Sequence, residues 1–167
     1  MSNLVHNKIA FIGKICSGKS HQSNLLCERY GFVRKSFGDK PKEICRDLFG
    51  MVGKDRKLIQ TVAETLKTID QNVWINYVVT SIISSTETNI VIDDCRFPNE
   101  YEALKNLGFY FIYINISKED QLSNIKKTYK DDYDQHIKNL DHISESYIES
   151  LRQYCDIEIN SGDILNI

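Results

Sequence analysis

Short apolar runs alternate with amphipathic stretches along the chain. The runs have the length and residue types of strands, and they lie at 8–12, 32–37, 89–94, 109–116 and 157–159. Between them apolar residues recur every three or four positions, which predicts helices at 20–30, 42–49, 55–69, 73–84, 98–107, 118–129 and 143–154. Because strands and helices alternate, we expect an α/β fold with a doubly wound parallel sheet of five strands flanked by helices.

Several residues mark where these elements begin and end. Gly31 is expected to close the first helix, Pro41 suits the first position of the next one, and Ser117 should cap the helix that starts at Lys118. The segment 130–140 is strongly charged and poor in apolar residues, so we expect it to be mobile.

The junction between the first strand and the first helix carries the most specific motif. It reads Gly13, Lys14, Ile15, Cys16, Ser17, Gly18, Lys19, Ser20 and fits G-x-x-x-x-G-K-[ST], the phosphate-binding P-loop. Its backbone N–H groups would cradle ATP phosphates, Lys19 would reach the β- and γ-phosphates, and Ser20 would ligate Mg²⁺. The alternative is an ordinary glycine-rich turn, but a strand before the loop and a helix after it favour the phosphate site.

Size, charge and cysteine content narrow the class of protein. The 167 residues suit a single P-loop domain over 1–167, and a net charge of −2 argues against a nucleic-acid partner. Neither a membrane-length apolar run nor a signal-peptide layout is present, so we expect no membrane partner. Five scattered cysteines indicate reduced thiols in the cytoplasm, with Cys16 as a small residue rather than a redox switch. A homodimer remains open.

The strand at 89–94 ends in two acids at the sheet edge where open α/β proteins place their chemistry. Asp93 and Asp94 are the candidates to hold Mg²⁺ beside Ser20, and we favour Asp94. Arg96 follows and could grip a phosphate with two hydrogen bonds, so Lys19, Asp94 and Arg96 are the candidate catalytic residues. Turn chemistry at the acids and a surface salt bridge at Arg96 are the alternatives.

The helical region at about 39–84 is the candidate site for the phosphate acceptor. Asp39 and Lys42 follow the second strand at the same edge as the loop, although Asp39 equally suits a helix cap. Gln60 could contact a base, or lie on a solvated helix face. Trp74 could stack on a base, but a tryptophan in an apolar stripe is more often core.

A charged segment at about 117–145 is the candidate for a small helical lid that closes over the phosphates. Its candidate phosphate contacts are Lys126, Lys127, Lys130 and Lys138. His142 and Glu145 lie where the segment rejoins the body. A solvated loop, and a structural histidine, are the alternatives.

Several stretches together resemble the bacteriophage and viral-type deoxynucleoside monophosphate kinases of the P-loop nucleotide kinase superfamily. The most specific is Asp94-Cys95-Arg96-Phe97-Pro98-Asn99-Glu100, which is similar to the family signature D-x-R-F-x-N-E. Further stretches similar to the family lie, in the same order, at 36–43, 56–61, 69–76, 141–145 and 155–162. The resemblance covers most of the chain.

The resemblance implies a phosphotransferase that uses ATP and Mg²⁺ to convert a deoxynucleoside monophosphate into the diphosphate. By position, Asp94 matches the acid of the signature and Arg96 its arginine. The resemblance also implies a viral source, in which case the enzyme would act in the host cytoplasm. Two features depart from kinase patterns: residues 117–150 contain no arginine, so lysines, Arg96 or Arg152 must serve, and Lys42 stands where adenylate kinases commonly have arginine.

Two other functions fit parts of the sequence. Animal-type phosphomevalonate kinases share a similar P-loop and an Asp-x-Arg strand end, so the acceptor could be a different small molecule. A regulatory protein that uses a bound nucleotide as a switch needs the loop but no acceptor.

Overall fold

A parallel β-sheet organises the larger part of the protein in this computed structural model, which describes residues 6–130, 133–138, 140 and 143–165. Its strands are β1 (Lys8–Ile12), β2 (Val33–Lys35), β3 (Ile90–Ile92), β4 (Tyr110–Asn115) and β5 (Ile157–Asn160). Over the described residues the sheet has five strands in the order β2-β3-β1-β4-β5, and the pairs β1–β3, β1–β4 and β4–β5 are parallel. β1 is therefore central, and its carboxyl end leads into the P-loop.

The sheet is held by apolar side chains that the strands bury on both faces. Ile9 and Phe11 of β1 are fully buried and cluster with Val91 of β3, Ile112 of β4 and Leu26 of helix α1. Strands buried on both faces read as continuous apolar runs, which is why these segments show little alternation. Burial of each such side chain contributes about 1.5–3 kcal/mol.

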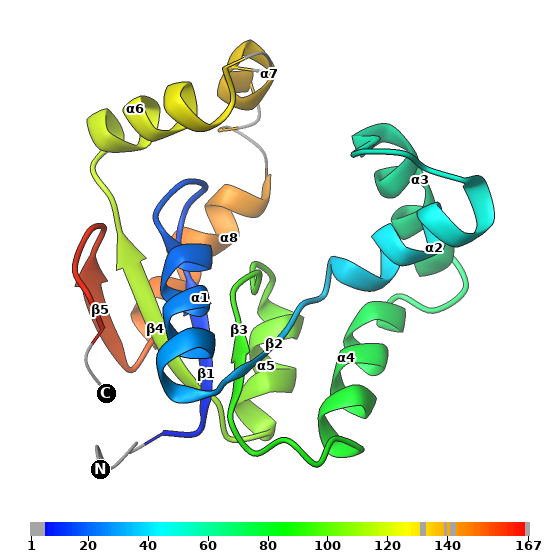
Figure 1. Cartoon of the computed structure of the whole chain (residues 1–167), viewed down its shortest axis with the longest axis horizontal. Coiled ribbons are helices and arrows are strands. Elements are labelled where there is room, and N and C mark those ends of the chain that lie inside the picture. The colour runs from blue at the N-terminus through cyan, green and yellow to red at the C-terminus, as the bar shows by residue number, and fades with distance from the viewer. Residues whose placement is uncertain (1–5, 131–132, 139, 141–142, 166–167) are drawn as a thin grey trace. The chain divides into compact units, whose positions relative to one another are not determined.

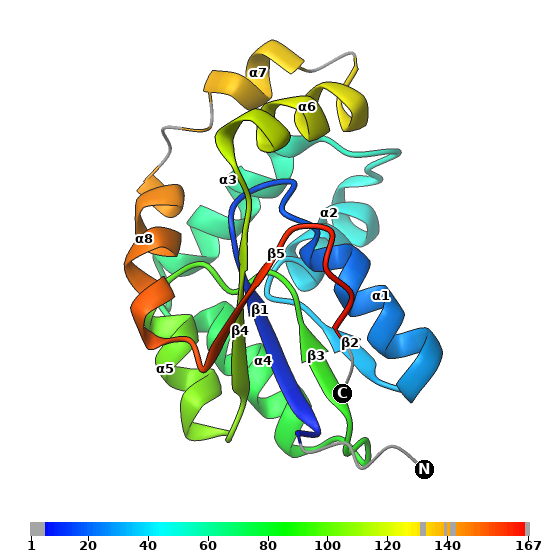
Figure 2. The same cartoon turned by 90° about the vertical axis from the view of Figure 1, so that its left-hand side faces the viewer.

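Helices cover both faces of this sheet. The structure contains α1 (Lys19–Tyr30), α5 (Pro98–Asn106), α6 (Lys118–Thr128), α7 (Tyr133–Lys138) and α8 (Ile143–Leu151), with a 3₁₀ turn at Arg152–Tyr154. Figure 2 views the sheet along its edge and shows α1 on one face and α5 and α8 on the other. α6 and α7 lie beyond the carboxyl ends of β1 and β4, at the end of the sheet that carries the P-loop (Figure 1). The doubly wound fold predicted from the sequence is confirmed.

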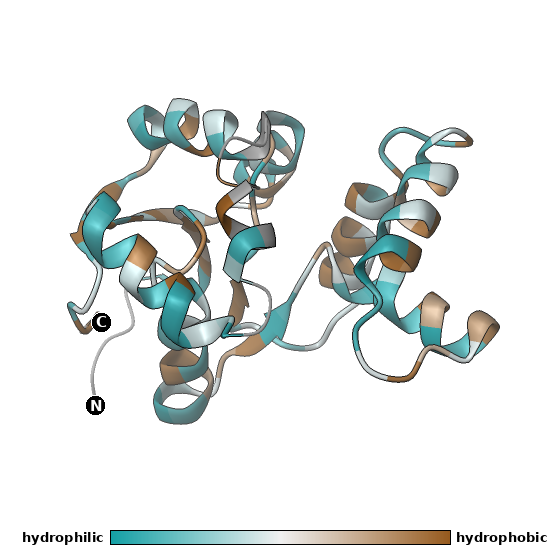
Figure 3. Cartoon of the chain, turned by 90° about the horizontal axis from the view of Figure 1, so that it is seen from above, coloured by the Kyte–Doolittle hydropathy of each residue, from teal (hydrophilic) through white to brown (hydrophobic). Residues whose placement is uncertain are grey.

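Residues 35–87 form a second compact unit built of helices. These are α2 (Asp39–Phe49), α3 (Arg56–Lys67) and α4 (Val73–Ile83). Figure 3 shows hydrophobic residues along all three. The indole N–H of Trp74 in α4 donates to the Ala63 carbonyl of α3 at 3.2 Å, and this bond joins the two helices. Within the described parts of both units, no helix is both long and apolar enough to cross a membrane.

Most predicted elements are present with ends that shift by one to three residues, and the main differences are in β2, α2 and α7. Gly31 closes α1 with a φ of 68°, and the Ser117 hydroxyl accepts from the Asp120 N–H at 3.0 Å, as predicted. β2 is shorter than the predicted strand. α2 begins at Asp39, so Pro41 is its third residue, where a helix still needs no N–H donor. α7 forms inside the charged segment that we expected to be mobile.

The turn between β3 and α5 is organised by one buried carboxylate. Glu100 Oε2 accepts hydrogen bonds from the backbone N–H of Arg96 at 2.7 Å and of Phe97 at 3.0 Å. Both donors are groups that the start of α5 would otherwise leave unpaired. Burial of Glu100 raises its pKa to about 7, although the two N–H donors act in the opposite direction. The last residue of the signature stretch thus supports the backbone of Arg96.

The raised pKa of Glu100 predicts a dependence of stability on pH. Its stabilising contribution is complete below the unfolded pKa of about 4.5 and is lost as the pH rises through the folded pKa of about 7. Glu100→Gln keeps a carbonyl acceptor but cannot ionise. We expect the free energy of unfolding of Glu100→Gln, relative to the wild type, to rise by about 1–3 kcal/mol between pH 5 and pH 8. Urea unfolding at the two pH values measures this, and an identical difference at both would contradict it.

Candidate active site

The P-loop joins β1 to α1 in a conformation that its glycines permit. A Cβ on Gly13 would lie 2.7 Å from Ser17 Oγ and 2.8 Å from the Ile114 carbonyl oxygen, so a larger residue would have to displace the backbone. Gly18 adopts a φ of 102°, which L side chains rarely allow. The sequence predicted this loop, and the structure explains why both glycines are needed.

Lys19 is buried against the loop that precedes it. Its Nζ donates to the carbonyls of Gly13 at 2.5 Å and of Lys14 at 2.7 Å. The pKa of Lys19 is lowered to about 8. Burial is the largest cause and the positive charge of Arg96 the second, while Glu145 and Asp93 have weaker effects in the opposite direction. A bound polyphosphate would favour the charged form, so this site is electrostatically suited to an anion.

Charged residues from two other segments act on this lysine. The electrostatic neighbours of Lys19 include Asp93 and Arg96, which follow β3, and Glu145 in α8. The Asp93 carboxylate is buried and receives Arg34 Nε at 2.8 Å. Asp94 is less buried than Asp93, so its carboxylate is the more accessible of the two to a metal ion.

The predicted metal ligands suit Mg²⁺ chemically. Ser20 is exposed in the first turn of α1, and Asp94 stands directly after Asp93 at the end of β3. A hydroxyl and a carboxylate are the hard oxygen donors that Mg²⁺ prefers, and this ion takes its other ligands from phosphates and water. Ser20 and Asp94 would therefore hold the ion that neutralises charge on the ATP phosphates.

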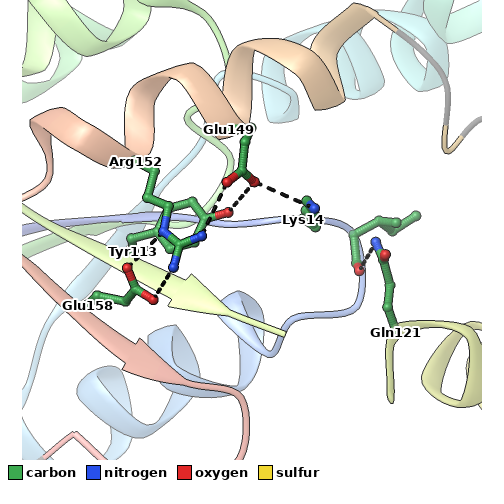
Figure 4. A network of polar contacts seen from close by, with 7 residues as sticks. Lys14, Tyr113, Gln121, Glu149, Arg152 and Glu158 are labelled. Carbon is green, nitrogen blue, oxygen red and sulfur yellow. Dashed lines mark hydrogen bonds and ion pairs between the residues drawn. The ribbon is translucent and has the colours of Figure 1, made fainter. Parts of the chain in front are cut away.

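A network of polar contacts connects the P-loop to α8 and β4 (Figure 4). Lys14 Nζ lies 3.5 Å from the Glu149 carboxylate of α8, which also accepts from the Tyr113 hydroxyl at 3.1 Å. Arg152 donates to Glu149 at 3.2 Å and to both carboxylate oxygens of Glu158 at 2.6 and 2.8 Å. Partial burial opposes ionisation of Glu149, but hydrogen bonds from Arg152 and Tyr113 leave its pKa below the usual value. Residues 117–150 contain no arginine to contact phosphates. Because two carboxylates already bind Arg152, Arg96 is the better candidate for that contact.

Two amide side chains of α6 also contact the loop, and sequence reasoning missed them. Gln121 Nε2 donates to the Ile15 carbonyl at 3.1 Å, and Asn124 Nδ2 donates to the Cys16 carbonyl at 3.2 Å. Their spacing of three residues places both on one helix face, but nothing in the sequence says that this face meets the loop.

Four of the five predicted acceptor residues lie in the unit of residues 35–87, and the fifth, Arg96, which was also expected to bind the acceptor phosphate, follows β3. Lys42 Nζ donates to the Asp39 carboxylate at 3.1 Å, one turn apart on α2. Gln60 is exposed on α3, whereas Trp74 is 8% exposed and its N–H is occupied by Ala63. Burial and this bond give Trp74 a structural role within the unit, and its contact with a base stays a prediction.

The predicted lid residues are placed in part. Lys126 and Lys127 occupy the last turn of α6, Lys130 follows it, and all three are exposed. The backbone of Lys138 ends α7. His142 lies outside the described residues. The five cysteines are free, and Cys16 adopts a φ of 60° in the loop.

Two curated proteins show sequence similarity to this chain, and no family model matches it. Uncharacterized protein ORF77 of Ictalurid herpesvirus 1 (strain Auburn) is 27% identical over 112 residues, which cover 64% of this chain and 49% of that protein. A protein of Acanthamoeba polyphaga mimivirus named "Putative deoxynucleotide monophosphate kinase" is 26% identical over 140 residues, 64% of this chain and 72% of that protein. The match thus spans about half the length of the first relative and nearly three quarters of the second.

Solved structures share the fold at low identity. A gluconokinase from Sinorhizobium meliloti 1021 has a TM-score of 0.51 at 15% identity, covering 94% of this chain and 83% of its own. Shikimate kinase from Aquifex aeolicus has a TM-score of 0.56 at 18% identity, covering 93% and 88%. An uncharacterized protein from Eubacterium ventriosum has a TM-score of 0.58 at 16% identity, with the same coverage. The chain therefore has the fold of the P-loop kinases, and the resemblance to viral-type deoxynucleoside monophosphate kinases that its sequence predicts is confirmed.

Proposed function

We propose that this protein transfers the γ-phosphoryl group of ATP to a nucleoside 5′-monophosphate, with deoxy forms preferred. The observation that carries the proposal is the P-loop itself, in which Lys19 lies on the Gly13 and Lys14 carbonyls and is near enough to Arg96 for that positive charge to act on it. A nucleotide switch needs only the loop. A kinase also needs a second cation beside the transferred group, because charge spreads over its oxygens in the transition state.

The roles of the donor side follow from the geometry of the loop. The backbone of residues 13–20 would hold the β- and γ-phosphates, and Lys19 would leave its carbonyl partners to neutralise the transferred group. Mg²⁺, when bound, would supply positive charge that neutralises the phosphates. Ser20 and Asp94 would hold it, and the bond from Glu100 to the Arg96 N–H would keep Arg96 aimed at the phosphates.

The identity of the acceptor is supported by the similarity to the mimivirus protein and by the resemblance to deoxynucleoside monophosphate kinases. Lys42 would exchange its Asp39 partner for the acceptor phosphate. Gln60 and Trp74 would shape the base site. Exposed Lys126, Lys127 and Lys130 would cover the phosphates when the segment at about 117–145 closes as a lid and excludes water. This placement would prevent wasteful hydrolysis of ATP.

A coupled assay of ADP release tests the proposed function. The full chain is mixed with Mg²⁺ and ATP, and a panel of deoxynucleoside and ribonucleoside monophosphates is added, with phosphomevalonate, gluconate and shikimate as other acceptors. We expect one or more deoxynucleoside monophosphates to raise ADP release at least a hundredfold above the rate without acceptor. Stimulation by phosphomevalonate alone would assign a different acceptor, and slow hydrolysis that no acceptor raises would reject a kinase.

Replacement of the loop lysine tests the donor site. Lys19→Ala removes the cation that would neutralise the transferred phosphoryl group, so we expect kcat to fall by about three orders of magnitude, a loss typical of a transition-state charge contact. The protein should stay folded, because the change removes two hydrogen bonds to loop carbonyls and no apolar core side chain. Lys105→Ala, at an exposed position of α5, is the matched control and should keep full activity. Near-normal turnover of Lys19→Ala would reject the loop as the donor site.

A further inference from the structure

The carbonyl groups at the top of the P-loop are held by one face of α6. Gln121 Nε2 reaches the Ile15 oxygen and Asn124 Nδ2 reaches the Cys16 oxygen, at 3.1 and 3.2 Å. Two residues at a spacing of three thus bind the carbonyls of two consecutive residues of the loop. Gln121 itself is 5% exposed, so its amide is fixed by this contact.

The direction of a carbonyl decides the direction of the N–H in the same peptide group. A trans peptide is planar, so its C=O and N–H point to opposite sides. With the carbonyls of Ile15 and Cys16 held toward α6, the N–H groups of Cys16 and Ser17 point away from it. The Ser17 N–H closes a turn on the Lys14 carbonyl at 3.2 Å. Because the Ser17 N–H is engaged in this turn, the donor that the α6 side chains orient for a phosphate is the Cys16 N–H.

The same contacts oppose a local strain. Cys16 has a φ of 60°, the one positive value at a non-glycine residue in the described parts of the chain. A residue with a Cβ pays an energetic penalty in this left-handed region. Asn124 bonds the carbonyl of the strained residue itself, and Gln121 bonds the one before it. Loss of either donor would let the loop relax toward other conformations.

The chemistry of the two side chains suits this role. An amide N–H₂ donates to a carbonyl without carrying charge, so it neither attracts phosphate to the wrong side of the loop nor leaves when phosphate binds. Lys14, by contrast, is an ion-pair partner of Glu149 on α8 and could exchange that partner for an anion. The neutral contacts from α6 do not compete with an anion for their partners.

We propose that α6 is a brace for the P-loop, in which Gln121 and Asn124 are positioning residues that orient the loop amides before nucleotide arrives. This inference rests on the proposed use of the loop as the ATP site. Neither side chain touches a reacting atom, and both act through the backbone of Ile15 and Cys16. Since α6 is the first helix of the proposed lid, these hydrogen bonds also link the lid to the ATP site.

Neutral replacements of similar size test the brace in the full chain. Gln121→Met and Asn124→Leu each remove one donor without adding charge, and Ser123→Ala, at an exposed position between them, is the matched control. Inorganic tripolyphosphate with Mg²⁺ is the main probe, because it contacts the loop but no base site. We expect calorimetry to show a threefold to tenfold loss of affinity for tripolyphosphate and for ATP in each variant, the usual effect of one hydrogen bond. Ser123→Ala should bind both within twofold of the wild type.

Two further readouts separate positioning from general stability. In steady-state kinetics the KM for ATP should rise by a similar factor, while kcat and the KM for the acceptor stay within twofold. In the unliganded chain, hydrogen exchange at the Cys16 and Ser17 amides should be faster in both variants and unchanged in Ser123→Ala. The two variants remove separate hydrogen bonds. If one of them fails to fold, the measurements on the other still test the brace.

The outcomes distinguish this inference from the proposed function. If the wild type binds ATP and tripolyphosphate, and folded Gln121→Met and Asn124→Leu bind them equally well, the brace is wrong and the ATP site stands. A parallel loss in ATP affinity, acceptor affinity and melting temperature would also overturn it, because that pattern describes a general packing defect. If the wild type binds neither probe, the proposed function fails and the brace fails with it.

Discussion

The structure depends on a short loop that must be both tight and correctly oriented. Residues 13–18 turn the chain from the centre of a parallel sheet into α1, and Gly13 has no room for a side chain beside Ser17 and Ile114. Parallel sheets bring the carboxyl ends of their strands together, so residues after β3 and β4 reach the same place without long connections. This topology explains how Asp93 and Arg96, which follow β3, come near enough to Lys19 to act on its pKa.

Support for the loop is distributed over elements that carry no candidate catalytic residue. Glu149 of α8 pairs with Lys14, while Tyr113 and Arg152 hold Glu149 in turn. Glu100 holds the backbone at Arg96, and Arg34 of β2 fixes Asp93. Each is an ionic or charge-assisted contact, stronger than a neutral hydrogen bond and dependent on burial. The loop and the turn after β3 are thus held by carboxylate side chains of neighbouring segments.

Features that depend on residues close together in the chain were predicted correctly from the sequence. The loop, the Gly31 end of α1 and the Ser117 cap rest on residues whose backbone and side-chain preferences act within a few positions. The extent of α2 and the presence of α7 were missed, because Asp39 and the charged segment have weak local signals. Gln121, Asn124 and Glu149 were missed for another reason: their partners lie about a hundred residues away, and only packing shows which helix face meets the loop. The roles of Asp94, Lys42, Gln60 and the lid lysines remain predictions.

Amide ¹H–¹⁵N spectra recorded while ATP and Mg²⁺ are added test the central claim most directly, since they report on each backbone donor separately. If the loop after β1 grips polyphosphate, the largest shifts will fall on the amides of residues 14–20, and Lys19 will exchange its Gly13 and Lys14 carbonyl partners for the nucleotide. ATP that binds while these resonances stay in place would contradict the account.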